Sequence, residues 1–178
     1  MFGRRKVPSN LTPSLERDER VLAWARLNDG VALVATNRGL WLPVGGGDLR
    51  RLGWHEIHKA TWGDGVLTLV AADSTPLIED SDISVAVDSA PEAYKLDDAD
   101  NLPKRIRERV TASVAYTSLH QLPTGGSARV VGRRISGRDG LSWFVRYEGN
   151  VDRTDPAVIA ATSELVQAAR DSINEAEG

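Results

Sequence analysis

Between residues 20 and 72, short runs of alternating apolar and polar residues are separated by glycine, asparagine and aspartate. Alternation with a period of two is typical of a β-strand with one buried face, and Asn-Asp-Gly between two such runs favours a hairpin turn. The third run is expected to end at Pro43 and the glycines at 45–47. The pattern predicts a meander of five strands, at residues 20–27, 31–36, 40–42, 54–62 and 66–72.

The spacing of apolar residues changes after residue 101. Four of them recur at every fourth position: Leu102, Ile106, Val110 and Val114. Because this spacing places them on one helical face, it predicts an amphipathic helix at residues 102–113. The next run, 114–119, could extend the helix or form a strand, since its composition suits both.

The last third of the chain predicts a hairpin and a second helix. Strands at 128–135 and 141–147 are separated by Gly137-Arg138-Asp139-Gly140, which favours a chain reversal. Asp155 followed by Pro156 is typical of a helix N-terminus. This helix is expected to bury one stripe of side chains: Val158, Ile159, Thr162, Leu165, Val166, Ala169 and Ile173.

Composition narrows the class of protein. The hydrophobic fraction of 41% and the charged fraction of 26% are ordinary for a globular chain. The chain has no cysteine, which excludes disulfides, thiolate catalysis and Cys-ligated zinc. No apolar run approaches the ~18 residues of a membrane-spanning helix. We therefore expect a cytoplasmic protein, in which the basic residues Arg4, Arg5 and Lys6 could add a weak attraction to an anionic membrane surface.

The formal net charge of −3 conceals two blocks of opposite sign. Residues 73–100 contain nine acidic residues against Lys95 alone, whereas residues 102–148 contain Lys104 and eight arginines against three acidic residues. A basic region is the electrostatic footprint of a nucleic-acid or anionic-lipid binder, although charge clusters are more often solvated surfaces. The arginines considered for nucleic-acid binding are Arg105, Arg107, Arg129, Arg133, Arg134 and Arg138.

The stretch HEIH at residues 55–58 is the sharpest candidate for a metal site. A metalloprotease helix needs its second histidine four residues after the first, and Lys59 stands there. On the predicted strand, side chains alternate between the two faces, so His55 and His58 are expected to point apart. With three histidines and no cysteine in the chain, we expect no metal site, and no motif calls for a cofactor.

Four segments of the meander resemble bacterial pleckstrin-homology-like (PH-like) domains. The first is an acidic turn that leads into strand one, Arg17-Asp18-Glu19-Arg20-Val21-Leu22, and the second is a T-[DN]-x-x-L turn within Leu33–Leu40. The third is a [YW]-x-x-I strand, Trp54-His55-Glu56-Ile57, and the fourth is a G-x-L-x-L strand at Gly65–Leu69. The resemblance covers residues 15–115 if 83–87 and 93–96 supply the remaining strands and 102–113 the closing helix. The whole chain also resembles a group of actinobacterial proteins in which a hairpin and a helix are appended at the C-terminal end.

The resemblance implies an α+β fold, in which an antiparallel meander forms a PH-like curved sheet or small barrel closed by a helix, followed by an appended β-hairpin and a C-terminal helix. It divides the chain into a flexible basic arm at 1–14, a PH-like domain at 15–115 and a C-terminal part at 116–178 that packs on the first. Such domains are used more often for binding than for catalysis, so the resemblance implies no catalytic residues. Its first loop, at 28–30, carries no cation, which argues against lipid binding there.

These observations favour a non-catalytic binding or scaffold protein whose curved sheet or exposed strand edge accepts a protein partner. Trp41 and Trp143 are the tryptophans expected to contribute to binding. The alternative is a nucleic-acid or ribosome-associated protein that uses the arginine-rich region 102–138. A third hypothesis, an enzyme, would have its site around Arg38, Glu56 and His58.

Overall fold

The computed structural model describes residues 5–178, which form two compact units that interleave along the chain. The first unit comprises residues 5–71, 88–113 and 135–138, and the second comprises 72–87, 114–134 and 139–178. The predicted single boundary near residue 115 does not separate these units completely, because two segments lie on the other side of it. Residues 72–87 belong to the second unit because their strand pairs with a C-terminal strand, and the loop 135–138 belongs to the first.

Four antiparallel strands form the first sheet of the first unit, in the order β1 (Val21–Arg26), β2 (Ala32–Thr36), β3 (Gly39–Gly45) and β4 (Asp48–Gly53). The strand β4 is missing from the predicted meander, which ended at the glycines that follow Pro43. Those glycines do not end the sheet, because Gly45, Gly46 and Gly47 have φ angles of +96°, +63° and +87°. Glycine adopts such angles without steric cost, so the chain reverses there and returns as β4.

The remaining strands of the first unit are β5 (Ile57–Gly63), the first part of β6 (Val66–Pro76) and β8 (Glu92–Lys95), which pairs with β6. The predicted strand 54–62 is wrong at its start, since Trp54–Glu56 form a 3-10 turn. Two side-chain hydrogen bonds hold this turn: the Gly53 amide donates to Glu56 Oε2 at 2.7 Å, and Trp54 Nε1 donates to the Thr36 carbonyl at 3.0 Å. The strand alternation used for the two histidines therefore does not apply to His55.

The helix predicted at 102–113 is confirmed as α1 (Leu102–Ser113). It packs against β1, β2 and β5, and its Leu102 and Ile106 are fully buried in the core beside Leu33, Leu40 and Ile57. Full burial of an aliphatic side chain contributes roughly 1.5–3 kcal/mol, so this face fixes the helix on the unit. The start of α1 is thereby held close to β1.

The N-terminal segment covers the other face of the first sheet. Residues Ser9–Leu11 form one 3-10 turn, and Val7 and Leu11 pack against a small buried cluster that contains Trp24 and Val34. From Arg5 onward, the predicted flexible arm thus packs against the first unit. Arg4 lies outside the described residues.

The second unit contains the end of β6 with β7 (Ile83–Asp88), β11 (Ser142–Glu148), β10 (Ser127–Arg133) and β9 (Val114–Gln121), hydrogen-bonded in that order. The predicted hairpin is confirmed by the antiparallel pairing of β10 and β11, while β7 runs parallel to β11. The run after α1, which could have been helix or strand, is a strand along its whole length and pairs with β10.

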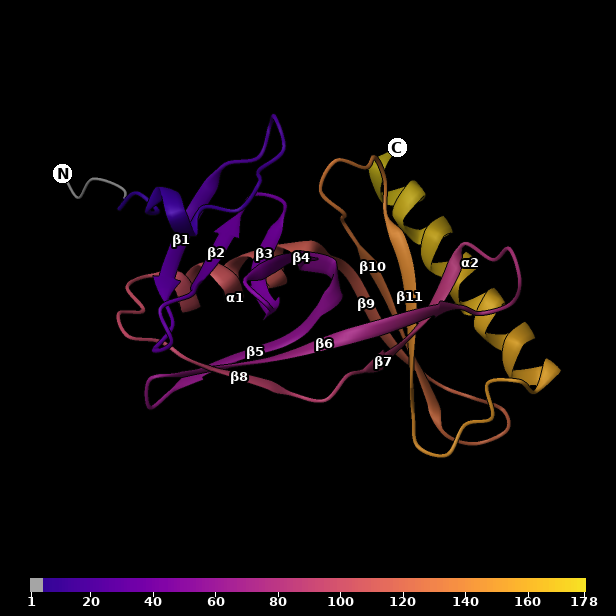
Figure 1. Ribbon diagram of the computed structural model, residues 1–178. Helices are drawn as coiled ribbons and strands as arrows, with labels where there is room; N and C mark the ends of the chain where they lie inside the picture. The colour runs from indigo at the N-terminus through magenta and orange to yellow at the C-terminus, as the bar shows by residue number, and fades with distance from the viewer. Residues whose placement is uncertain (1–4) are drawn as a thin grey trace. The chain divides into compact units, whose positions relative to one another are not determined.

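The C-terminal helix α2 (Pro156–Glu177) lies along β10 and β11 (Figure 1). Asp155 caps it as predicted, because its Oδ1 accepts a hydrogen bond from the Ala157 amide at 2.9 Å. Within the predicted stripe, Val158, Thr162, Val166 and Ala169 are buried. They cover one sheet face, where Trp143 and Val145 also lie.

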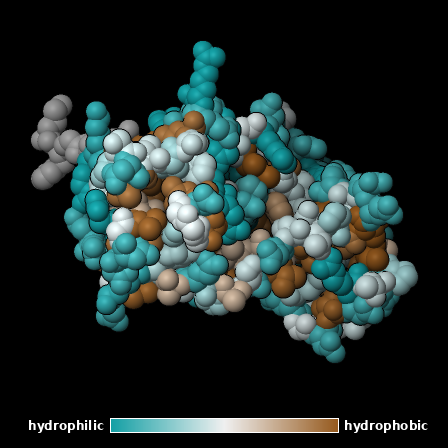
Figure 2. Space-filling view, viewed as in Figure 1, coloured by the Kyte–Doolittle hydropathy of each residue, from teal (hydrophilic) through white to brown (hydrophobic). Residues whose placement is uncertain are grey.

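The predicted α+β class is confirmed, with sheets that are mostly antiparallel and two helices, one of them C-terminal. None of the helices within residues 5–178 is both long and apolar enough to cross a membrane. On the face seen in Figure 2, hydrophobic residues form small patches interrupted by polar ones.

Candidate functional site

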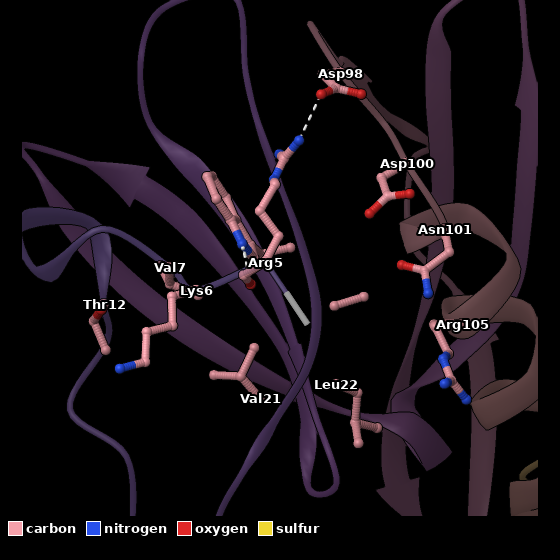
Figure 3. A pocket seen from close by; sticks show the side chains of 12 residues that line it. Arg5, Lys6, Val7, Thr12, Val21, Leu22, Asp98, Asp100, Asn101 and Arg105 are labelled. Carbon is pink, nitrogen blue, oxygen red and sulfur yellow. Dashed lines mark hydrogen bonds and ion pairs between the residues drawn. The ribbon is translucent and has the colours of Figure 1, made fainter. Parts of the chain in front are cut away.

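A cavity of about 1020 Å³ opens beside β1, bordered by the N-terminal segment and the start of α1 (Figure 3). Its volume is at the upper end of the roughly 300–1,000 Å³ typical of ligand sites. One part of its wall is apolar: Val7, Val21, Leu22, Ala23 and Trp24. The charged part comes from segments far apart in sequence: Arg5, Lys6, Asp98, Asp100 and Arg105. We call this cavity the β1 groove.

The strand that lines the groove is the terminal strand of its sheet, since within residues 5–178 the sheet order pairs β1 with β2 alone. Its last residues are covered on the outer edge, because the Asp97 amide donates to the Arg26 carbonyl at 3.0 Å. Backbone groups of an antiparallel strand alternate between its two edges. Trp24, two residues before Arg26, therefore presents its amide and carbonyl on that same outer edge, where the groove lies.

Arg5 crosses the groove and contacts both of its walls. Its carbonyl accepts a hydrogen bond from Trp24 Nε1 at 2.9 Å, and its guanidinium carbon lies 4.3 Å from the centre of the Trp24 ring. The same guanidinium reaches Asp98, with Nη1 2.5 Å from Oδ2 (Figure 3). One arginine thus stacks on an indole and pairs with a carboxylate from a segment 93 residues away.

The arginines proposed for nucleic-acid binding are divided between the two units. In α1, Arg105 lines the groove and lies 3.5 Å from Glu108, whereas Arg107 is exposed outside the groove. In the segment after β10, Arg134 and Arg138 are exposed, and Arg138 belongs to the first unit.

The two arginines of β10 are engaged by the second unit itself. Arg129 Nε lies 3.1 Å from Glu148 Oε1. Arg133 is only 8% exposed, and burial, followed by repulsion from Arg146, lowers its pKa. These arginines therefore belong to the second unit, and those of α1 to the first.

The two predicted tryptophans are both engaged in packing. Trp143 is 6% exposed in the core of the second unit, with its ring 5.6 Å from that of Tyr116. Trp41 is half-buried in β3, where its Nε1 donates a hydrogen bond to Glu19. Neither lines the β1 groove.

Glu19 is the centre of a buried polar network. Its side chain is 0% exposed and pairs with Arg51 Nη1 at 2.7 Å, while Thr36 Oγ1 donates to it at 2.6 Å. Burial alone would raise the pKa of Glu19, but hydrogen bonds from Thr36, the Glu16 amide and Trp41, together with the charge of Arg51, outweigh burial and lower it. Because every donor is matched, we interpret this network as structural.

The three residues of the enzyme hypothesis do not share a site. Arg38 and Glu56 line a small cavity of about 170 Å³ together with His55. The guanidinium of Arg38 pairs with Asp18 and, at 2.8 Å, with Glu16, while His58 lies in β5 with its Nδ1 2.8 Å from Asp88 Oδ1. Within residues 5–178, no three histidine, aspartate or glutamate side chains gather as metal ligands would.

Trp24, Asp98 and Asp100 were not predicted as site residues, and Arg5 and Lys6 were predicted to lie in a flexible arm that could be weakly attracted to an anionic membrane surface. In the structure both basic residues line the groove. A tryptophan in a predicted strand and an acidic stretch before a predicted helix were visible signals. What the sequence could not provide was their proximity to the N-terminal segment.

Comparison of the chain with protein-family models, with curated proteins and with solved structures finds no match.

Proposed function

We propose that the chain is a non-catalytic binding module that accepts an extended segment of a partner protein in the β1 groove. The observation that carries this proposal is the position of the groove along the outer edge of a terminal strand. An edge strand offers unpaired amide and carbonyl groups, and an added peptide strand satisfies them. The motif resemblance to PH-like domains, which are used more for binding than for catalysis, supports the same proposal.

The dimensions and chemistry of the groove suit a short peptide. The four β1 residues in its wall, Val21 to Trp24, span roughly 13 Å at about 3.3 Å per residue. The apolar wall can take the side chains of one peptide face, and the charged wall, with both signs present, can take polar side chains. In this mode of binding the backbone pairing provides affinity and the side-chain contacts provide specificity.

Selection of a random heptapeptide library on the immobilised full chain tests this function. We expect enriched peptides to bind the groove, so that they slow amide hydrogen exchange in β1. Arg105→Glu should change their affinity by about tenfold or more, because Arg105 lines the groove. The matched control is Arg107→Glu, which reverses the charge of an exposed residue of the same helix outside the groove and should leave the affinity within about twofold.

The proposal is overturned if no peptide is enriched. It is also overturned if the enriched peptides bind both arginine variants equally and protect amides outside β1. A cytoplasmic location, expected from a chain without cysteine, stays part of this proposal. Nucleic-acid binding through residues 102–138 remains the alternative, and it would have to draw on arginines of both units.

A further inference from the structure

Arg5 is held in the β1 groove by features that would bind an arginine from any source. The indole of Trp24 lies under its guanidinium at 4.3 Å from ring centre to guanidinium carbon, and the carboxylate of Asp98 is 2.5 Å from Nη1. An aromatic face and a carboxylate are the two groups that proteins use most directly to recognise a planar guanidinium. Asp100, close by in Figure 3, adds a second negative charge to this end of the groove.

The arginine that occupies this position is only loosely held. The Arg5 side chain is 38% exposed and that of Asp98 is 70% exposed. Ion pairs with such exposure are weak, since water and salt screen them. Another guanidinium can therefore exchange with Arg5 without rearrangement of the core.

We propose that Trp24 and Asp98 form a subsite for an arginine side chain of the bound partner segment, and that Arg5 fills this subsite when no partner is present. This inference rests on the proposed peptide-binding function and names one required residue of the partner. The ligand chemistry is a guanidinium rather than an ammonium, because the planar group stacks on the indole while it pairs with the carboxylate. Arg5 then acts as a competitor tethered within the same chain.

A tethered competitor has a measurable effect. It lowers the apparent affinity of the partner by the fraction of molecules in which the subsite is already filled. If Arg5 fills the subsite in about nine molecules of ten, its removal tightens binding about tenfold. The gain should be confined to ligands that contain arginine, because other side chains do not compete for the subsite.

The test uses two short probes, acetyl-Gly-Arg-Gly-amide and its lysine counterpart, titrated into the full-length chain. Binding is followed by calorimetry and by the NMR signal of the Trp24 indole N–H, which a Trp24→Phe variant identifies. We expect Arg5→Ala to bind the arginine probe about ten times more tightly than the unmodified chain. Asp98→Asn added to Arg5→Ala should abolish the gain, and the lysine probe should show a smaller one.

Arg17→Ala is the matched control, since it removes an exposed arginine that does not line the groove. The inference is overturned if Arg5→Ala binds the arginine probe no better than Arg17→Ala, which would make Arg5 a structural strap. If Arg5→Ala is unfolded by circular dichroism, Arg5→Lys replaces it, because this variant keeps the charge and loses the stacked plane. It should then bind the arginine probe more tightly than the unmodified chain, and equal affinity overturns the inference.

The two proposals fail in different ways. If library peptides protect β1 but Arg5→Ala brings no gain for arginine, the subsite is rejected and the peptide-binding function stands. If neither the library nor the probes bind, both are rejected.

Discussion

Trp41 Nε1 donates a hydrogen bond to the buried carboxylate of Glu19, 2.9 Å away. Thr36 Oγ1 donates to the same carboxylate at 2.6 Å, and Arg51 pairs with it. Glu19 lies in the acidic motif before β1, and Thr36, the last residue of β2, begins the T-[DN]-x-x-L motif. These motif residues therefore meet in one polar network, which ties the turn before β1 to the first sheet.

Removal of the Glu19 side chain should destabilise the protein strongly. Glu19→Ala leaves Arg51 Nη1, Thr36 Oγ1 and Trp41 Nε1 without this acceptor, so we expect the free energy of unfolding to fall by roughly 2–4 kcal/mol. Urea unfolding followed by tryptophan fluorescence measures this change. Glu16→Ala is the control, since it removes a carboxylate that pairs with the same Arg51 but is 49% exposed, and it should cost less than about 1 kcal/mol. Equal losses in the two variants would contradict the central role of Glu19.

The lowered pKa of Glu19 predicts a pH dependence of stability. In the unfolded chain Glu19 takes up its proton near its ordinary pKa of 4.5, whereas in the folded protein it does so only at lower pH. The ionised carboxylate therefore stabilises the fold above about pH 4.5, and this contribution is lost as the pH falls through the folded pKa. Below about pH 4.5, the free energy of unfolding should fall more steeply in the unmodified protein than in Glu19→Gln. Parallel curves for the two proteins would show that another group controls acid unfolding.

Most strands and both helices could be predicted because their signals are local. Asn-Asp-Gly and Gly-Asp-Gly turns, alternation, and a four-residue apolar spacing each depend on neighbours in sequence. The strand β4 was not predicted because it shows no strong pattern of buried residues: Leu52 is its one buried residue. The 3-10 turn at 54–56 was not predicted because Trp54 Nε1 donates its hydrogen bond to the Thr36 carbonyl, which lies eighteen positions earlier in the sequence.

The β1 groove could not be predicted because its parts meet only in the folded chain. The Arg5 carbonyl and Trp24 Nε1 come from residues 19 positions apart, and Arg5 and Asp98 from residues 93 apart. In the sequence, Arg5 is one of several basic residues in the N-terminal segment, and Asp98 is one of nine acidic residues between 73 and 100, so neither indicates a site by itself. Local patterns are thus sufficient to predict elements such as α1, whereas a site assembled from three separate segments requires the tertiary structure.

The engagement of two of the six arginines within the second unit predicts weaker nucleic-acid binding, with a reduced salt dependence. Six phosphate contacts on single-stranded RNA would give a slope of log K against log salt of about −4. Because Arg129 pairs with Glu148 and Arg133 is buried, at most four of the six arginines are left to contact phosphates, and we expect a slope no steeper than about −3. Fluorescence anisotropy with a labelled single-stranded RNA across a salt series measures it. A slope near that for six contacts would restore the nucleic-acid alternative.

Gly39, the first residue of β3, is required by the close approach of two strands. It lies opposite Gly53 in the pairing of β3 with β4, and a Cβ at this position would press into the carbonyl oxygen of Leu52. Because that oxygen is part of the backbone, it cannot move aside as a flexible side chain would. We expect Gly39→Ala to lower the free energy of unfolding by about 1–3 kcal/mol.

Gly63→Ala is the matched control, since Gly63 also lies in a strand but a Cβ there meets no atom within 4 Å. Its effect on the free energy of unfolding should be within about 1 kcal/mol and can be stabilising. Equal stability of the two variants, measured by urea unfolding, would show that β3 and β4 separate more easily than their contact implies.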